Sequence, residues 1–123
     1  DPDVVIILDN TLLKTVPVTA GINQPDDAII INSSENPSVL RAQLKIDVGK
    51  VWTVPATEIA LKILGSPITN TAMLGAVAKA TEVITLDALE KTIHQRFNDE
   101  LAEKNFAVIK QAYQEAKSEE NSQ

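Results

Sequence analysis

Residues 66–80 read Ser66-Pro67-Ile68-Thr69-Asn70-Thr71-Ala72-Met73-Leu74-Gly75-Ala76-Val77-Ala78-Lys79-Ala80. After an opening turn, this pattern predicts a helix of about ten residues whose only charge is Lys79. Helices at a protein surface are polar on one side, whereas small and apolar side chains dominate all sides of this one. We therefore expect a buried central helix with neighbours close on most sides, capped at its amino end by Asn70 or Thr69.

Helices are also predicted on either side of this stretch. Pro55 opens the preceding helix and Gly65 ends it, and apolar residues recur on one of its faces at three- and four-residue spacing. A following helix starts at the cap Thr85 and has its own apolar stripe. The last helix covers about residues 99–117, and the polar tail 118–123 is expected to fray.

Three short runs of β-branched and aliphatic residues precede these helices, at residues 3–8, 28–31 and 50–54. Continuous apolar runs are typical of strands that are covered on both faces of a parallel sheet. A helix from Pro37 to about Leu44, with Asn36 as its N-cap, joins the second run to the third. This order of elements predicts an α/β fold with a mostly parallel sheet.

The chain of 123 residues has the length of one domain. We divide residues 1–123 into an α/β part (1–65), a helical part (66–117) and the frayed tail (118–123). Three strands beneath this many helices make a thin sheet, so we expect further strands from an upstream segment or a partner chain. The chain opens on Asp1 and enters a strand almost at once, which fits a fragment or a processed chain.

Composition narrows the class of partner. Hydrophobic residues make up 44% of the chain and aromatic residues 3%, so the core must consist of Ile, Val, Leu and Ala. The net charge is −6 and no Lys/Arg cluster appears, which argues against nucleic acid or an anionic membrane as a partner. The absence of cysteine excludes disulfides, thiolate ligation of an iron–sulfur cluster and a thiol nucleophile in these residues, and it is compatible with the cytoplasm.

Asp9 follows the first predicted strand, where ligands bind in open α/β sheets. The run Asp3 to Asp9 also resembles the phosphoacceptor strand of response-regulator receiver domains. That fold needs an acidic pair upstream, which is absent, and a Lys-Pro after a later strand, where this chain has Val54-Pro55. A loop carboxylate that caps backbone N–H groups is the simpler interpretation.

No catalytic constellation stands out elsewhere. His94 is the single histidine and is placed on the polar side of its helix, so neither a metal site nor a Ser-His-Asp triad is supported. Asn70 and Thr71 begin the central helix and could meet a phosphate or carboxylate through backbone N–H groups, although ordinary capping explains them as well. The acidic residues of the last two helices are interpreted as a solvated face; they are Glu90, Glu100, Glu103 and Glu115.

A family resemblance is carried by residues 57–76, Thr57-Glu58-Ile59-Ala60-Leu61-Lys62-Ile63-Leu64-Gly65-Ser66-Pro67-Ile68-Thr69-Asn70-Thr71-Ala72-Met73-Leu74-Gly75-Ala76. This stretch resembles the gamma subunit of pyruvate:ferredoxin oxidoreductase, or pyruvate synthase, in the 2-oxoacid:ferredoxin oxidoreductase family. Residues 3–13, 81–89 and 96–105 agree in the same order. The family's gamma subunit is longer, and its upstream Gly-Arg-Gly-Gly-Gln-Gly-type motif is absent here, so the chain looks like the carboxyl-terminal part.

The resemblance implies a three-layer Rossmann-like domain that packs on the catalytic subunits of an enzyme. That enzyme converts a 2-oxoacid, with pyruvate the best guess, and coenzyme A to acyl-CoA and CO2 and reduces ferredoxin. Thiamine diphosphate and Mg2+ would belong to the alpha and beta subunits, and [4Fe–4S] clusters to the beta and delta subunits. No catalytic residue carries over onto this chain. The resemblance also implies that this chain contributes to the coenzyme A cleft. Asn70 and Thr71 are the candidate contacts with coenzyme A or a subunit.

Two other hypotheses remain open at this point. A stand-alone nucleotide or coenzyme A binding module would bind an adenine nucleotide unaided. A pure interaction domain would show an apolar patch at the sheet edge and poor solubility alone.

Overall fold

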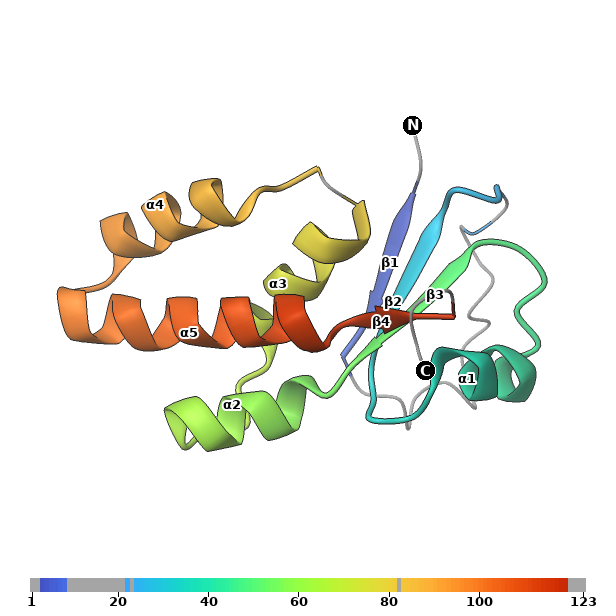
Figure 1. Ribbon diagram of the computed structural model, residues 1–123, viewed down its shortest axis with the longest axis horizontal. Helices are drawn as coiled ribbons and strands as arrows, with labels where there is room; N and C mark the ends of the chain where they lie inside the picture. Colours follow the sequence, from blue (N-terminus) through green and yellow to red (C-terminus); the bar gives the residue numbers. More distant parts are fainter. Residues whose placement is uncertain (1–2, 9–21, 23, 82, 120–123) are drawn as a thin grey trace.

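The computed structural model describes residues 3–8, 22, 24–81 and 83–119, and these form a mixed sheet with helices on both faces (Figure 1). The strands lie in the order β1 (Val4–Ile7), β2 (Ala28–Asn32), β3 (Lys50–Val54) and β4 (Lys117–Ser118). The first three are parallel, and β4 is antiparallel to β3. The predicted α/β class and mostly parallel sheet are confirmed.

The helices are divided unequally between the two faces. Helix α1 (Pro37–Leu44) covers one face, and α2 (Ala56–Leu64), α3 (Asn70–Thr81) and α5 (Asp99–Glu115) cover the other. Helix α4 (Leu86–Arg96) packs against α3 and α5, away from the sheet. None of the helices within the described residues has the length and apolar character that a membrane span requires.

The central strand β2 shows why its apolar run is continuous. Ile29 and Ile31 face α1 and pack with Leu40, whereas Ile30 faces the other helices and packs with Ala72 and Met73 of α3. All three isoleucines have no exposed surface. Because successive side chains of a strand point to opposite faces, a strand covered on both sides must be apolar at every position.

Strand β1 departs from this expectation. Val5 and Ile7 pack in the cluster beneath α1, but Val4, Ile6 and Leu8 are 37%, 44% and 45% exposed. Ile6 pairs with Ile30, so these side chains lie on the face that carries α2, α3 and α5. The prediction that this strand is covered on both faces is therefore wrong for one face, because the helices reach β2 and β3 but do not cover β1.

Helix α3 is buried as its composition predicts. Ala72 and Ala76 have no exposed surface, and Met73 is 2% exposed. A Cβ atom on Gly75 would overlap the backbone oxygen of Ile109 and would lie 3.0 Å from the Cβ of Ala112. Helices α3 and α5 therefore cross so closely that only glycine fits at the crossing.

Several helix ends agree with their sequence signals. Thr85 Oγ1 accepts a hydrogen bond from the N–H of Ala88 at 3.1 Å, which is the predicted cap of α4. Gly65 ends α2 in the left-handed conformation, with φ of 71°. Asn36 does precede Pro37 at the start of α1, but its side chain makes no capping hydrogen bond.

The carboxyl end of the described chain differs from the sequence prediction. Helix α5 ends at Glu115, not near residue 117, and Lys117 and Ser118 form β4 instead of the start of a frayed tail. Glu119 then accepts a hydrogen bond from Arg41 Nε of α1 at 2.7 Å. A two-residue strand has no periodicity of its own, so only its pairing with β3 identifies it.

Candidate functional site

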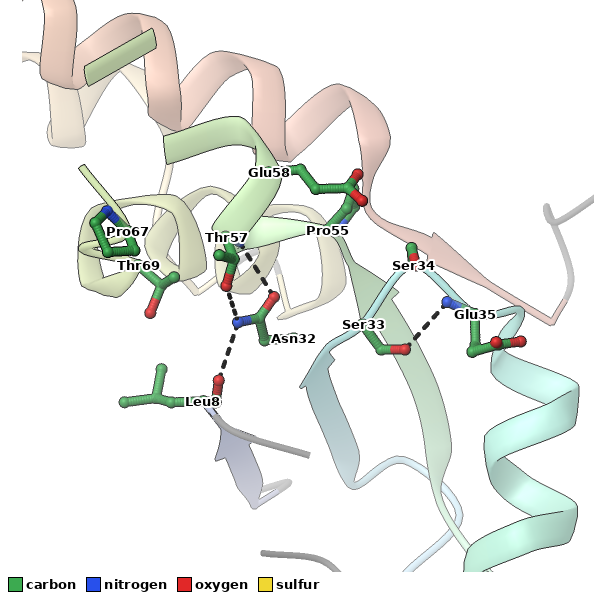
Figure 2. Close-up of a pocket in the computed structure, with 10 residues that line it drawn as sticks. All are labelled: Leu8, Asn32, Ser33, Ser34, Glu35, Pro55, Thr57, Glu58, Pro67 and Thr69. Carbon is green, nitrogen blue, oxygen red and sulfur yellow. Dashed lines mark hydrogen bonds between the residues drawn. The ribbon is translucent and has the colours of Figure 1, made fainter. Parts of the chain in front are cut away.

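A pocket of about 660 Å³ opens at the carboxyl ends of β1, β2 and β3, where α/β proteins with parallel sheets bind their ligands (Figure 2). Strand ends, the first turn of α2 and the segment that leads into α3 form its walls. Its lining residues are Leu8, Asn32, Ser33, Ser34, Glu35, Pro55, Thr57, Glu58, Pro67 and Thr69.

Asn32, the last residue of β2, joins two walls of the pocket. Its Nδ2 donates to the backbone oxygen of Leu8 at 3.0 Å and to Thr57 Oγ1 at 2.9 Å. Its Oδ1 accepts from the backbone N–H of Ala56 at 2.9 Å and of Thr57 at 3.3 Å. Figure 2 shows the amide between Leu8 and Thr57, bonded to both. One side chain thus holds the carboxyl end of β1 against the amino end of α2.

This amide replaces the missing local cap of α2. Pro55 occupies the N-cap position and has no side-chain acceptor, so the first N–H groups of the helix need a partner from elsewhere. Asn32 provides it from the neighbouring strand. Because an amide has two donor hydrogens and one acceptor oxygen with two lone pairs, these four contacts use its full hydrogen-bonding capacity.

The remaining polar groups of the pocket are hydroxyls and carboxylates. Ser33 Oγ is buried and accepts the N–H of Glu35 at 3.0 Å. Glu35 and Glu58 are exposed, and no ion pair of either lies within the described residues. Among the lining residues that the structure describes, none is a lysine, arginine or histidine. These described residues give the pocket two carboxylates and several hydroxyl oxygens.

The candidates Asn70 and Thr71 lie at the first turn of α3, beside but not among the lining residues. Asn70 is exposed. The Thr71 hydroxyl donates to Oδ1 of Asn105 on α5 at 3.3 Å, and Asn105 is buried. Their neighbour Thr69 does line the pocket. The contact of Asn70 or Thr71 with coenzyme A or a subunit stays a prediction.

The other candidate groups do not gather at the pocket. Asp9 lies outside the described residues. His94 is exposed on α4, on the far side of α3 and α5. Within residues 3–8, 22, 24–81 and 83–119, no group of three or more His, Cys, Asp or Glu residues is placed to hold a metal ion.

Sequence reasoning missed most of the pocket. Asn32 was given no role, and Ser33 and Ser34 were taken only as the approach to the helix at Pro37, although three polar residues directly after a buried strand are a signal for the ligand-binding end of a sheet. Thr57 and Glu58 carried no such signal, because the first turn of α2 becomes a pocket wall only when the strands are paired side by side.

Comparisons of the sequence with a family profile and with known proteins point to the same family. The sequence profile of the pyruvate ferredoxin/flavodoxin oxidoreductase family matches residues 1–115. The common gamma subunit of the pyruvate/ketoisovalerate oxidoreductases of Pyrococcus furiosus is 45% identical over 114 residues, which are 93% of this chain and 61% of that protein. Pyruvate synthase subunit PorC of Methanocaldococcus jannaschii is 40% identical over 116 residues, covering 94% of this chain and 60% of that protein.

A solved structure extends the likeness to the fold. The pyruvate oxidoreductase subunit PORC of Thermotoga maritima superposes with a TM-score of 0.84 at 32% identity, over 97% of this chain and 66% of that one. The chain therefore spans about three fifths of the length of the curated relatives that it matches.

Proposed function

Because the chain belongs to the pyruvate ferredoxin/flavodoxin oxidoreductase family, we propose that it acts as the non-catalytic gamma subunit, or part of it, of a 2-oxoacid:ferredoxin oxidoreductase. The family match across residues 1–115 carries this proposal, and the likeness to gamma and PorC subunits supports it. Pyruvate is the proposed substrate, since the relatives' names include pyruvate; ketoisovalerate in one of those names makes a branched-chain 2-oxoacid the nearest competitor.

In the proposed reaction, the bond between the carboxylate and the oxo carbon of the 2-oxoacid breaks and CO2 leaves. The acyl group is transferred to the sulfur of coenzyme A, and the two electrons released reduce ferredoxin. Thiamine diphosphate with Mg2+ supplies the carbanion stabilisation that this cleavage needs, and [4Fe–4S] clusters conduct the electrons. The reverse reaction would fix CO2.

We propose that these cofactors are held by other subunits of the complex. The sequence has no cysteine for cluster ligation, and the described residues present no cluster of metal-ligating side chains. Following the family resemblance, we assign thiamine diphosphate and Mg2+ to the alpha and beta subunits, and the clusters to the beta and delta subunits. No step of the chemistry is assigned to a residue of this chain.

The role assigned to this chain is to pack on those subunits and to help form the coenzyme A cleft. The pocket at the strand ends supports this role because it is a hydroxyl-lined cavity at the ligand-binding end of the sheet. Ferredoxin and the other subunits are the proposed partners, in the cytoplasm. The net charge of −6 gives no reason to add nucleic acid or an anionic membrane to them.

Affinity capture of the full-length subunit from an anaerobic extract of its source cells tests the proposal. We expect a brown eluate with broad visible absorbance, thiamine diphosphate, and partner chains rich in cysteine by mass spectrometry. A colourless protein without partners would contradict the proposal and favour a stand-alone nucleotide or coenzyme A binding module. Turnover assays of the captured complex with pyruvate and branched-chain 2-oxoacids would then identify the substrate.

A further inference from the structure

The first backbone N–H groups of α2 are bonded by a side chain of the protein itself. Free N–H groups and the helix dipole make such an end a ready site for phosphate in α/β folds. In this chain the N–H groups of Ala56 and Thr57 donate to Asn32 Oδ1 at 2.9 Å and 3.3 Å. The place where a phosphate would bind is occupied by a side-chain amide.

All hydrogen-bonding groups of the Asn32 side chain are used by contacts within the protein. Its two donor hydrogens are used by Leu8 O and Thr57 Oγ1, and its oxygen by the two helix N–H groups. It lines the pocket yet acts only on other protein groups. Its effect on a ligand must therefore come from the shape and electrostatics that it imposes.

The charged side chains of the pocket also oppose the binding of phosphate. Glu35 and Glu58 line it and have no ion pair within the described residues, and none of the described residues that line it is cationic. A phosphate here would face these two carboxylates. An uncharged ligand would instead find the hydroxyls of Ser34, Thr57 and Thr69.

We propose that Asn32 is a positioning residue that closes the amino end of α2 to phosphate, so that the pocket receives an uncharged, hydroxyl- or amide-bearing group. The proposal deepens the proposed function, on which it rests for the expectation that a ligand enters here. Phosphate groups of such a ligand would lie outside this pocket.

Phosphate binding is tested on the full-length subunit, with whatever partners co-purify, by hydrogen–deuterium exchange at residues 56–58 during titration with inorganic phosphate. We expect phosphate to give no protection in the wild type and saturable protection in Asn32→Ala. The phosphate affinity of Asn32→Ala should exceed the upper bound set by the wild-type titration about three- to tenfold or more. The control Glu58→Gln removes a carboxylate but keeps the cap, so it should show no protection. Protection in the wild type, or in Glu58→Gln but not in Asn32→Ala, would overturn the proposal.

The ligand class is tested with pantetheine, an uncharged chain of amides and hydroxyls. It should slow exchange at residues 32–35 and 56–58 in the wild type, and Ser34→Ala should weaken this response about threefold or more. A wild type that responds to phosphate but not to pantetheine would overturn the assigned class. This exchange measurement requires no enzyme turnover. A negative result would therefore contradict the ligand class proposed for the pocket without contradicting the proposed oxidoreductase subunit, which the affinity capture tests.

Asn32→Asp tests positioning without removing the cap. The carboxylate keeps both acceptor contacts with α2 and loses both donor contacts, including the one to Leu8. We expect faster exchange in β1 and unchanged exchange in the first turn of α2. Unchanged exchange in β1 would show that the amide does not position the strand end.

Discussion

Gly75 is the residue on which the packing of α3 depends most directly. No side-chain atom fits between it and the backbone of Ile109, so α3 and α5 approach to backbone contact. The neighbours Ala72, Ala76 and Ala112 are fully buried around this crossing. The sequence predicted close neighbours from small side chains, and the structure identifies α5 as the helix that requires them.

Replacing Gly75 with Leu should lower the free energy of unfolding by about 1–3 kcal/mol or more, because the larger side chain can be accommodated only by separating α3 from α5. Ala88→Leu is the matched control, since Ala88 is exposed on α4 and should tolerate the same side chain within about 0.5 kcal/mol. Urea unfolding followed by circular dichroism measures both. Equal stability of the two variants would contradict a closely packed α3.

Thr71 provides a second prediction at this scale, because its hydroxyl bonds Asn105 of α5. Thr71→Val should lower the free energy of unfolding by about 1 kcal/mol, since the buried Asn105 loses a partner. Asn70→Ala removes an exposed side chain and should cost less. A Thr71→Val variant with unchanged stability but weakened coenzyme A binding would favour a ligand contact over the helix contact.

Among the secondary-structure elements, α1 carries a side chain that bonds the residue directly after β4. The Arg41 guanidinium donates to the backbone oxygens of Ile46, at 2.9 Å, and Gly49, and it pairs with Glu119 at 2.7 Å. One planar group thus connects the end of α1, the turn before β3 and the residue after β4. The pair with Glu119 adds to the backbone pairing of β4 with β3 at the sheet edge.

Arg41→Ala should therefore lower the free energy of unfolding by about 1–3 kcal/mol, because two backbone oxygens lose a charged donor. Glu119→Gln leaves both of those bonds in place and removes only a half-exposed ion pair, so it should cost under about 1 kcal/mol. Thermal unfolding of both variants at one salt concentration makes the comparison. If Glu119→Gln costs as much as Arg41→Ala, the ion pair is the main stabilising contact.

At the scale of the whole molecule, β1 leaves the sheet of the described residues with one uncovered face. Val4, Ile6 and Leu8 are exposed there, although strands with this composition are usually buried. Apolar edge strands tend to pair with other chains. The described fold therefore has an apolar surface where further chain of the same or another molecule can pack.

Sedimentation velocity of the 123-residue chain at increasing concentration tests this surface. We expect the average mass to rise with concentration, and Ile6→Lys to suppress the rise because a charge on an edge strand opposes pairing. Leu61→Lys places the same charge on exposed α2 and should leave association unchanged. A wild-type mass that is independent of concentration would contradict the prediction.

How much of the structure the sequence predicts depends on how far apart the interacting residues lie along the chain. Strands β1, β2 and β3, helix α3 and the cap at Thr85 were predicted because their signals lie within a few neighbouring residues. The pocket was not, because Asn32 meets its partners Leu8 and Thr57 across 24 and 25 residues. No local sequence pattern indicates such contacts, so Asn32 was given no role and Ser33 and Ser34 were taken only as the approach to the helix at Pro37.

The sequence by itself determined the order of the elements from β1 to α5, the buried character of β2 and α3, and the family, because periodicity, composition and motif are properties of contiguous residues. Only the tertiary structure decided the antiparallel pairing of β4, the closure of α2 by Asn32 and the contact of Gly75 with Ile109. Each of these needs groups far apart in the chain to meet in space, and their geometry is set by how the sheet and helices pack together.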